Sequence, residues 1–182
     1  MSLPTISVKA QQSPNFYVDI SSISTIGIVD SENISLTPKN LLSAGITCGN
    51  EFRSKKNFVL ALEFYYYNNK LVIAEEGDDR FELHQCLGAN IKPGFNYGKH
   101  TSFLISGINA VYLFDKNENT GHQIDRFDDS IFWGIEQNYQ INQNFKATIS
   151  YIYSKFERIS FYTTSTLKNF QIIKLGLGYT IN

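Results

Sequence analysis

The sequence has no long apolar run. Its mean hydropathy is −0.21, and no stretch approaches the roughly 18 consecutive apolar residues that a membrane-spanning helix needs. It also has no excess of one charge, because 16 Lys and Arg stand against 17 Asp and Glu. Nucleic acid is therefore not an expected partner. The only cysteines, Cys48 and Cys86, lack metal-binding spacing, so no zinc site is expected. Alternation places Cys48 outward and Cys86 inward, so a disulfide between them is not expected either.

Residues that favour strands are abundant instead, with 14 Phe and 11 Tyr. Alternation is clearest at the end of the chain. One face there carries Ile173, Leu175, Leu177, Tyr179 and Ile181, and the other carries Lys174, Gly176, Gly178 and Thr180. An apolar row that ends in an aromatic residue, opposite small and polar residues, is typical of a strand with lipid outside and a crowded lumen inside.

Eight alternating segments can be placed along the chain, and the connections between them are in turn long and short. The predicted strands are 15–24, 41–53, 57–67, 81–93, 101–114, 130–141, 145–156 and 169–181. The long connections are 25–40, 68–80, 115–129 and 157–168, and the short ones are 54–56, 94–100 and 142–144. This pattern predicts an all-β protein, an eight-stranded antiparallel up-and-down transmembrane barrel with short periplasmic turns and long external loops.

The length of 182 residues fits one domain. We expect residues 1–14 to form an N-terminal extension and residues 15–182 to form the single β-barrel domain. The first residues lack the charged and apolar regions of a signal peptide, so an outer-membrane location requires the chain to be a mature form.

The face opposite the apolar rows carries charges of both signs: Asp19, Glu51, Arg53, Glu63, Glu82, Lys92, Glu136, Lys146 and Lys174. Unpaired charges in an interior of low dielectric cost several kcal/mol each, so these residues should pair. At eight strands, side chains fill the lumen. We therefore expect a plugged, polar interior with a structural charge network of Glu63, Glu136, Lys146 and Lys174. The segment 101–114 is apolar on both faces and leaves its own register open.

Aromatic residues gather at both ends of the outward rows. Phe58, Phe145 and Tyr179 lie towards the short connections, and Tyr153 lies towards the long ones. Aromatic residues at the two membrane–water interfaces form such girdles in barrels. These four residues are the predicted aromatic girdle.

No catalytic, cofactor-binding or metal-binding site is predicted. His84 is inward near Glu82, but the intervening residue prevents an activated pair, while His100 and His122 fall in connections. The acidic residues Asp78, Asp79, Asp125, Asp128 and Asp129 lie in long connections, where a solvated acidic loop is a commoner explanation than a cation site. The expectation is a protein that is not an enzyme.

An alternative remains open, because alternation alone does not say which face is inside. A soluble lipocalin-like barrel would turn its apolar rows inward around a small apolar ligand. Glycines on the charged face favour the membrane barrel, since they suit a narrow lumen better than an exterior. The only tryptophan, Trp133, also lies far from the first strand, where lipocalins carry a Gly-x-Trp signature.

The eight-strand pattern, Leu62-Glu63-Phe64-Tyr65 and the closing Leu175-Gly-Leu-Gly-Tyr-Thr-Ile181 resemble the small outer-membrane β-barrel proteins. These include the OmpA transmembrane domain, OmpX, Opa-type proteins and the surface antigens of intracellular alphaproteobacteria. The chain departs from them in ending Tyr179-Thr-Ile-Asn182 rather than in a terminal aromatic residue.

The resemblance implies a place in the outer membrane of a Gram-negative bacterium. It also implies a non-enzymatic scaffold that presents surface loops, as an adhesin or surface antigen. The implied partners are outer-membrane lipid and host or surface proteins. Apolar residues in 25–40 and 157–168 suggest that strands extend above the membrane at these two connections.

Overall fold

The computed structural model describes residues 14–29, 35–36, 39–40, 43–75, 78–117, 123–157 and 169–181. Its strands are β1 (Asn15–Val29), β2 (Ser35–Leu36), β3 (Lys39–Asn40), β4 (Ala44–Arg53), β5 (Phe58–Glu75), β6 (Asp78–Tyr97), β7 (His100–Asn117), β8 (Gln123–Gln140), β9 (Phe145–Glu157) and β10 (Asn169–Ile181). No helix in the described part of the chain has the length and apolar character needed to cross a membrane.

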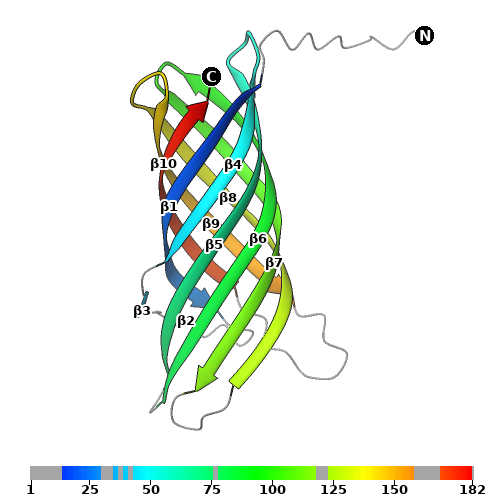
Figure 1. Ribbon diagram of the computed structural model, residues 1–182, viewed down its shortest axis with the longest axis vertical. Helices are drawn as coiled ribbons and strands as arrows, with labels where there is room; N and C mark the ends of the chain where they lie inside the picture. The colour runs from blue at the N-terminus through cyan, green and yellow to red at the C-terminus, as the bar shows by residue number, and fades with distance from the viewer. Residues whose placement is uncertain are drawn as a thin grey trace, which may run out of the picture.

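The eight long strands close into a barrel (Figure 1). Each pairs antiparallel with the next along the chain, and β10 returns to pair with β1 from Phe16↔Ile181 to Val29↔Asn169. The short strands β2 and β3 add to β1 and β5. Because the first and last long strands pair, the barrel has no open edge along this seam, which is how a β-structure satisfies its backbone in lipid. The predicted fold class is confirmed.

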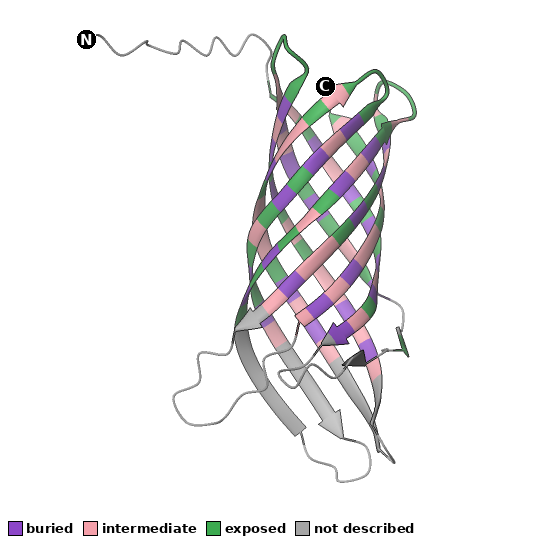
Figure 2. Ribbon diagram, turned by 180° about the vertical axis from the view of Figure 1, so that it is seen from behind, coloured by how far each residue is buried: buried purple, intermediate pink, exposed green. Residues whose placement is uncertain are grey.

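The apolar rows face outward. Among the described residues, Ile20, Phe64, Leu104, Ile135 and Leu175 are each more than half exposed on the outer wall. Figure 2 shows buried positions alternating with intermediate or exposed ones along much of the barrel wall, as a wall with two environments requires. A soluble carrier would need these rows inside, so the lipocalin-like alternative is wrong.

The segment whose register was open, now β7, places apolar residues on both faces. Phe103, Ile105 and Val111 are buried inside, and Leu104 and Ile108 face outward. The interior is therefore only partly polar, whereas the sequence predicted a polar one. A buried apolar layer, defined here as the loop-side layer, lies towards the long connections and consists of Ile23, Ile28, Leu71, Cys86, Val111, Phe170 and Ile172. Cys86 faces inward and Cys48 outward, as predicted.

At the short connections, the predicted strand ends lie close to the observed ones, except at the end of β6. Pro93 and Gly94 were expected to begin a turn at 94–100, but β6 continues through them to Tyr97. The turn is only Gly98-Lys99, with Tyr97 paired to His100. Gly98 has a φ of +69°, a left-handed conformation that glycine adopts without steric cost.

Two of the predicted long connections are largely strand. β5 and β6 pair as far as Glu75↔Asp78, within the predicted connection 68–80, and β7 and β8 pair as far as Lys116↔Gln123, within 115–129. Outside a membrane both faces of a hairpin meet water, so the apolar alternation that marks a strand disappears although backbone pairing continues. Alternation therefore underestimated the length of these four strands.

Of the two connections at which the sequence predicted extended strands, 25–40 is partly strand, because β1 continues to Val29 and pairs there with β2. Residues 158–168 of the other lie outside the described residues. The strands that extend furthest are β5, β6, β7 and β8, with 18 to 20 residues each against 13 in β9 and β10. Figure 1 shows their ends reaching past those of β1 and β10.

The glycines of the last strand face a crowded lumen. A Cβ added to Gly176 would lie 2.5 Å from Asp19 Oδ1, and one added to Gly178 would lie 2.8 Å from Lys146 Cε. Real Cβ atoms do not approach this closely. The small residues opposite the apolar row are therefore required by the charged side chains inside the barrel.

We predict that Gly176→Val destabilises the folded barrel by about 1–3 kcal/mol, because the added atoms overpack the lumen beside Asp19. Leu175→Val, a matched change of the neighbouring outward residue, should alter stability by less than about 0.5 kcal/mol. Urea titration of both variants in lipid vesicles gives the two free energies of unfolding. Equal values would contradict the crowded lumen.

We also predict that the chain folds only with detergent or lipid present, because its outer wall is apolar. The folded form should migrate differently on a denaturing gel before and after boiling, with a β-type circular dichroism spectrum that is lost on boiling. A monomeric β-form that is soluble without detergent would contradict the membrane barrel.

Candidate functional site

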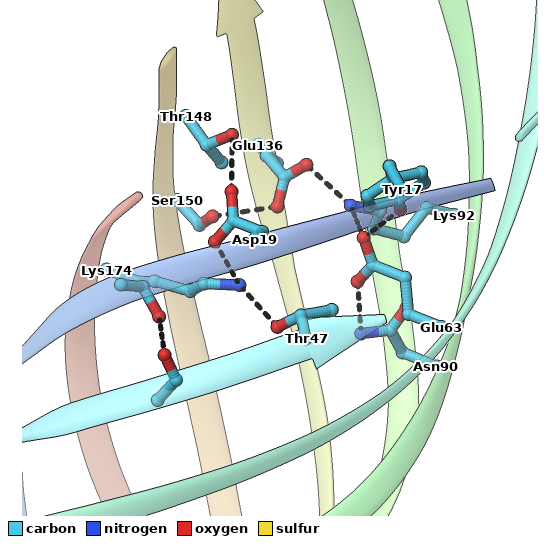
Figure 3. Close-up of polar contacts among 12 residues, drawn as sticks. Tyr17, Asp19, Thr47, Glu63, Asn90, Lys92, Glu136, Thr148, Ser150 and Lys174 are labelled. Atoms are coloured by element: carbon cyan, nitrogen blue, oxygen red, sulfur yellow. Dashed lines mark hydrogen bonds and ion pairs between the residues drawn. The ribbon is translucent and has the colours of Figure 1, made fainter. Parts of the chain in front are cut away.

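The centre of the barrel contains a cluster of charged side chains, most of which Figure 3 shows. We call it the lumen network, and it consists of three acids and three bases: Asp19, Glu63, Glu136, Lys92, Lys146 and Lys174. Five of these side chains are buried, and Lys174 is partly buried. Their formal charges cancel. An electrically neutral cluster is the arrangement that an interior of low dielectric tolerates best.

Lys92 lies at the centre of this network. Its ammonium group forms an ion pair with Glu63 and another with Glu136, where Nζ lies 2.6 Å from Oε1. It also lies 5.0 Å from the centre of the Phe103 ring on β7. Since Glu63 is on β5, Lys92 on β6 and Glu136 on β8, this one side chain connects four strands.

The two carboxylates have further donors. Glu63 accepts hydrogen bonds from the Tyr17 hydroxyl and from Asn90 Nδ2, the latter at 2.9 Å. Glu136 accepts one from Ser150 Oγ at 2.9 Å. A buried carboxylate has several lone pairs to satisfy, and these neutral donors supply what a single lysine cannot.

A second ion pair lies beside the first. Lys174 Nζ is 3.7 Å from Asp19 Oδ1 and donates a hydrogen bond to Thr47 Oγ1 at 3.1 Å. Asp19 also accepts one from Thr148 Oγ1 at 3.3 Å. These contacts bring in β1, β4, β9 and β10, so all eight long strands contribute a residue to the lumen network or to a contact with it.

The four residues proposed from the sequence occupy different places in this arrangement. Glu63 and Glu136 meet through Lys92, and Lys174 meets Asp19 instead of either glutamate. Lys146 stands over the Tyr17 ring, with Nζ 3.4 Å from the ring centre. Such cation–π contact stabilises an ammonium group without a carboxylate partner.

Lys92, Asp19 and Tyr17 have inward positions in the sequence pattern but lie outside the predicted network of four residues. Alternation assigns a face, whereas the choice of partner depends on strand order and register. The sequence contained one sign of the Tyr17 contact. Tyr17 has a long side chain that ends in a hydrogen-bond donor, and it lies at an inward position two residues before Asp19.

The lumen network lies between two different regions. Towards the turns, a hollow of about 320 Å³ is lined by Tyr17, Glu51, Arg53 and Lys146 among others, with Arg53 Nε 2.6 Å from Glu51 Oε1. Towards the long connections lie a cavity of about 40 Å³ and then the loop-side layer. Within the residues described, side chains therefore fill the barrel beyond the hollow. This is a packed interior and not a wide pore.

The predicted girdle residues all lie on the outer wall. Phe145 and Tyr179 pack together with ring centres 5.1 Å apart near the turns, where Phe58 is also exposed. Tyr153 packs 4.8 Å from Trp133 on the side of the long connections. Their action as a lipid-interface girdle remains a proposal.

The described histidines, His84 and His100, pack against aromatic rings. His84 is buried and packs edge-to-face on Phe170, with ring centres 5.0 Å apart, and His100 stacks on Tyr97. His122 lies outside the described residues, as does the side chain of Glu82. Among the described residues, no group of three His, Cys, Asp or Glu side chains could hold a metal ion.

We predict that Lys92→Met lowers the free energy of unfolding by about 3–5 kcal/mol, because it leaves two buried carboxylates without their cation. The triple variant Glu63→Gln, Lys92→Met, Glu136→Gln should recover much of this loss, since it also removes the stranded charges. Lys39→Met, at an exposed lysine, is the control and should change stability by less than about 0.5 kcal/mol. Urea titration in vesicles measures all three. A Lys92→Met barrel as stable as the control would rule out the bridging role.

No protein-family model matches the sequence, and no curated protein sequence matches it either. Solved structures do match in fold. The attachment invasion locus protein Ail of Yersinia pestis, in complex with the heparin analogue sucrose octasulfate, is 13% identical with a TM-score of 0.61, covering 93% of this chain and all of that one. Neisserial surface protein A is 18% identical with a TM-score of 0.61, covering 93% and 99%.

A major outer membrane protein from Thermus thermophilus is 8% identical with a TM-score of 0.56, covering 93% of this chain and all of that one. Identities this low establish the fold alone. The apolar outer wall independently requires a membrane around it, and the matching proteins are bacterial outer-membrane proteins. This chain has the fold of the small outer-membrane β-barrels, and its apolar outer wall is built to face lipid.

Proposed function

We propose that the protein is a non-enzymatic barrel that displays its long connections at the cell surface, as an adhesin or surface antigen. The observation that carries this proposal is the length of β5, β6, β7 and β8, which have 18 to 20 residues. At about 3.3 Å per residue and a tilt of about 40°, 18 residues rise roughly 45 Å, against an apolar band of about 25 Å. The four strands therefore extend well beyond the membrane.

The two hairpins formed by these strands supply a paired backbone outside the membrane. A scaffold without a display role would need only short connections. The lumen network also supports a role as a scaffold, because it joins all eight strands into a rigid base. Within the described residues, its side chains fill the centre of the lumen and leave no space there for a substrate. Catalysis has no supporting arrangement among the described residues.

The charge of the four predicted long connections indicates the class of partner. They carry 12 Asp and Glu against 7 Lys and Arg. Ail was crystallised with a sulfated heparin analogue, but an acidic display surface disfavours such polyanions. We infer a protein partner, with a neutral or basic surface, on a host cell or on a neighbouring bacterium.

We predict that trimming both extended hairpins removes surface binding and leaves the barrel intact. Residues 73–80 would be replaced by Asn-Gly between the paired Val72 and Phe81, and residues 115–124 likewise between the paired Phe114 and Asp125. Both joins keep the strand register, and Asn-Gly forms the tight hairpin turn. Bacteria displaying the trimmed barrel should bind epithelial cells at least about tenfold less than bacteria displaying the full chain, a loss of about 1.4 kcal/mol.

Surface amount, measured through an epitope tag, and the gel shift on boiling show that the trimmed barrel is displayed and folded. Binding by the full chain that is no greater than that of bacteria without it would reject the display function. Equal binding by trimmed and full chains would assign it to other connections. Competition with soluble heparin should have little effect on binding in either case.

A further inference from the structure

The outer wall near the turns carries a group of polar side chains that the barrel itself does not require. Tyr97, Ser102 and Gln137 lie on β6, β7 and β8 and face outward. Ser102 Oγ is 2.6 Å from Gln137 Oε1 and 2.9 Å from the Tyr97 hydroxyl, which lies 3.3 Å from Gln137 Oε1. Polar groups on a lipid-facing wall are costly unless they meet partners at the headgroup level.

Aromatic rings border this group. His100 stacks on Tyr97, with ring centres 5.7 Å apart, and lies 5.1 Å from Tyr139. We define the outer polar patch as Tyr97, His100, Ser102, Gln137 and Tyr139. Tyrosine and histidine rings combine an apolar body with a polar tip, so they suit the boundary between acyl chains and headgroups.

An apolar groove of about 720 Å³ begins at this patch and continues over the wall towards the middle of the membrane. Ser102 and Gln137 line its polar end, and Phe95, Leu104, Ile135 and Ile149 line the rest. Leu104 is 64% exposed, so the groove is open to the surrounding lipid. An apolar groove that ends in hydrogen-bonding groups matches the chemistry of a phospholipid, with its acyl chain and polar headgroup.

Charge then selects among phospholipids. The turn before β5 carries Lys55 and Lys56, and the turn before β7 carries Lys99; all three are exposed. The two turns are adjacent, because Asn96 N donates a hydrogen bond to Asn57 O at 2.8 Å. Neither turn contains an acidic residue. A phosphate at the level of the outer polar patch would therefore meet positive charge.

We propose that this face binds an anionic phospholipid of the turn-side leaflet. The phosphodiester oxygens would accept hydrogen bonds from the outer polar patch and lie near the lysines, while one acyl chain occupies the groove. Gln137 Nε2 makes a single long hydrogen bond, 3.4 Å to Asn138 O, which leaves its second N–H without a partner among the described residues. The site depends on the membrane location but not on the proposed display function.

Fluorescence quenching by brominated lipid tests the site in the full chain. Leu104→Trp in a Trp133→Phe background puts the only tryptophan in the groove. Ile20→Trp in the same background puts it on the outer face of β1, several strands away, where Ile20 is also exposed. Both are refolded into phosphatidylcholine vesicles with increasing fractions of dibrominated phosphatidylglycerol or dibrominated phosphatidylethanolamine.

We expect phosphatidylglycerol to half-saturate quenching at a lower mole fraction than phosphatidylethanolamine at Leu104→Trp, and the two lipids to be equivalent at Ile20→Trp. Lys99→Gln should weaken the phosphatidylglycerol preference by about fivefold, as removal of one lysine near a membrane surface does. Lys39→Gln, at an exposed lysine on β3, should not change it.

Because the groove probe occupies part of the site, native mass spectrometry of the otherwise unaltered protein gives a second measurement. The wild type should retain phosphatidylglycerol in preference to phosphatidylethanolamine. The combined Ser102→Leu and Gln137→Leu variant should lose this preference, whereas Asn50→Leu, an outward polar residue on β4, should keep it. No preference in the wild type, or one that survives the combined variant, would overturn the proposal.

Discussion

The barrel depends on one ammonium group shared by two carboxylates in its centre. Lys92 forms an ion pair with both Glu63 and Glu136, and further donors to those carboxylates come from β1, β6 and β9. Breaking a buried pair by removing one member is strongly destabilising, because it leaves an uncompensated charge. A register that separated these side chains would carry the same cost, so the lumen network disfavours alternative registers.

The residue types on the two faces of each strand follow from this interior. Small residues are needed where charged side chains cross the lumen, which explains why Gly176 and Gly178 face Asp19 and Lys146. The outer wall has no such constraint and is covered by large apolar side chains. On the side of the long connections, the loop-side layer closes the interior with apolar contacts instead of charges. The lumen thus changes from polar to apolar along its axis, and a solute would meet a different barrier in each part.

The two ends of this filled barrel differ in charge and in the side chains that they expose. Above the membrane, β5 to β8 continue as paired strands with an excess of acidic residues in their connections. Below, two of the three turns carry lysines and the wall next to them carries the outer polar patch. This difference in charge between the two ends agrees with the proposed display of the long connections and the proposed lipid site beside the turns.

The amino-acid sequence by itself determined the number of long strands, their antiparallel up-and-down order and the direction in which each strand faces. Period-two alternation reports the contrast between lipid and lumen, and that contrast exists wherever a strand crosses the membrane. Alternation failed where the contrast is absent. It missed the strand character of β5 to β8 outside the membrane, and it left β7 undecided because Phe103 and Ile105 are apolar residues on the inward face. Only the tertiary structure decided which inward charges meet. Lys92 lies between Glu63 and Glu136, and Lys146 lies over Tyr17, because ion pairing across a lumen depends on the register and curvature of strands far apart in the sequence.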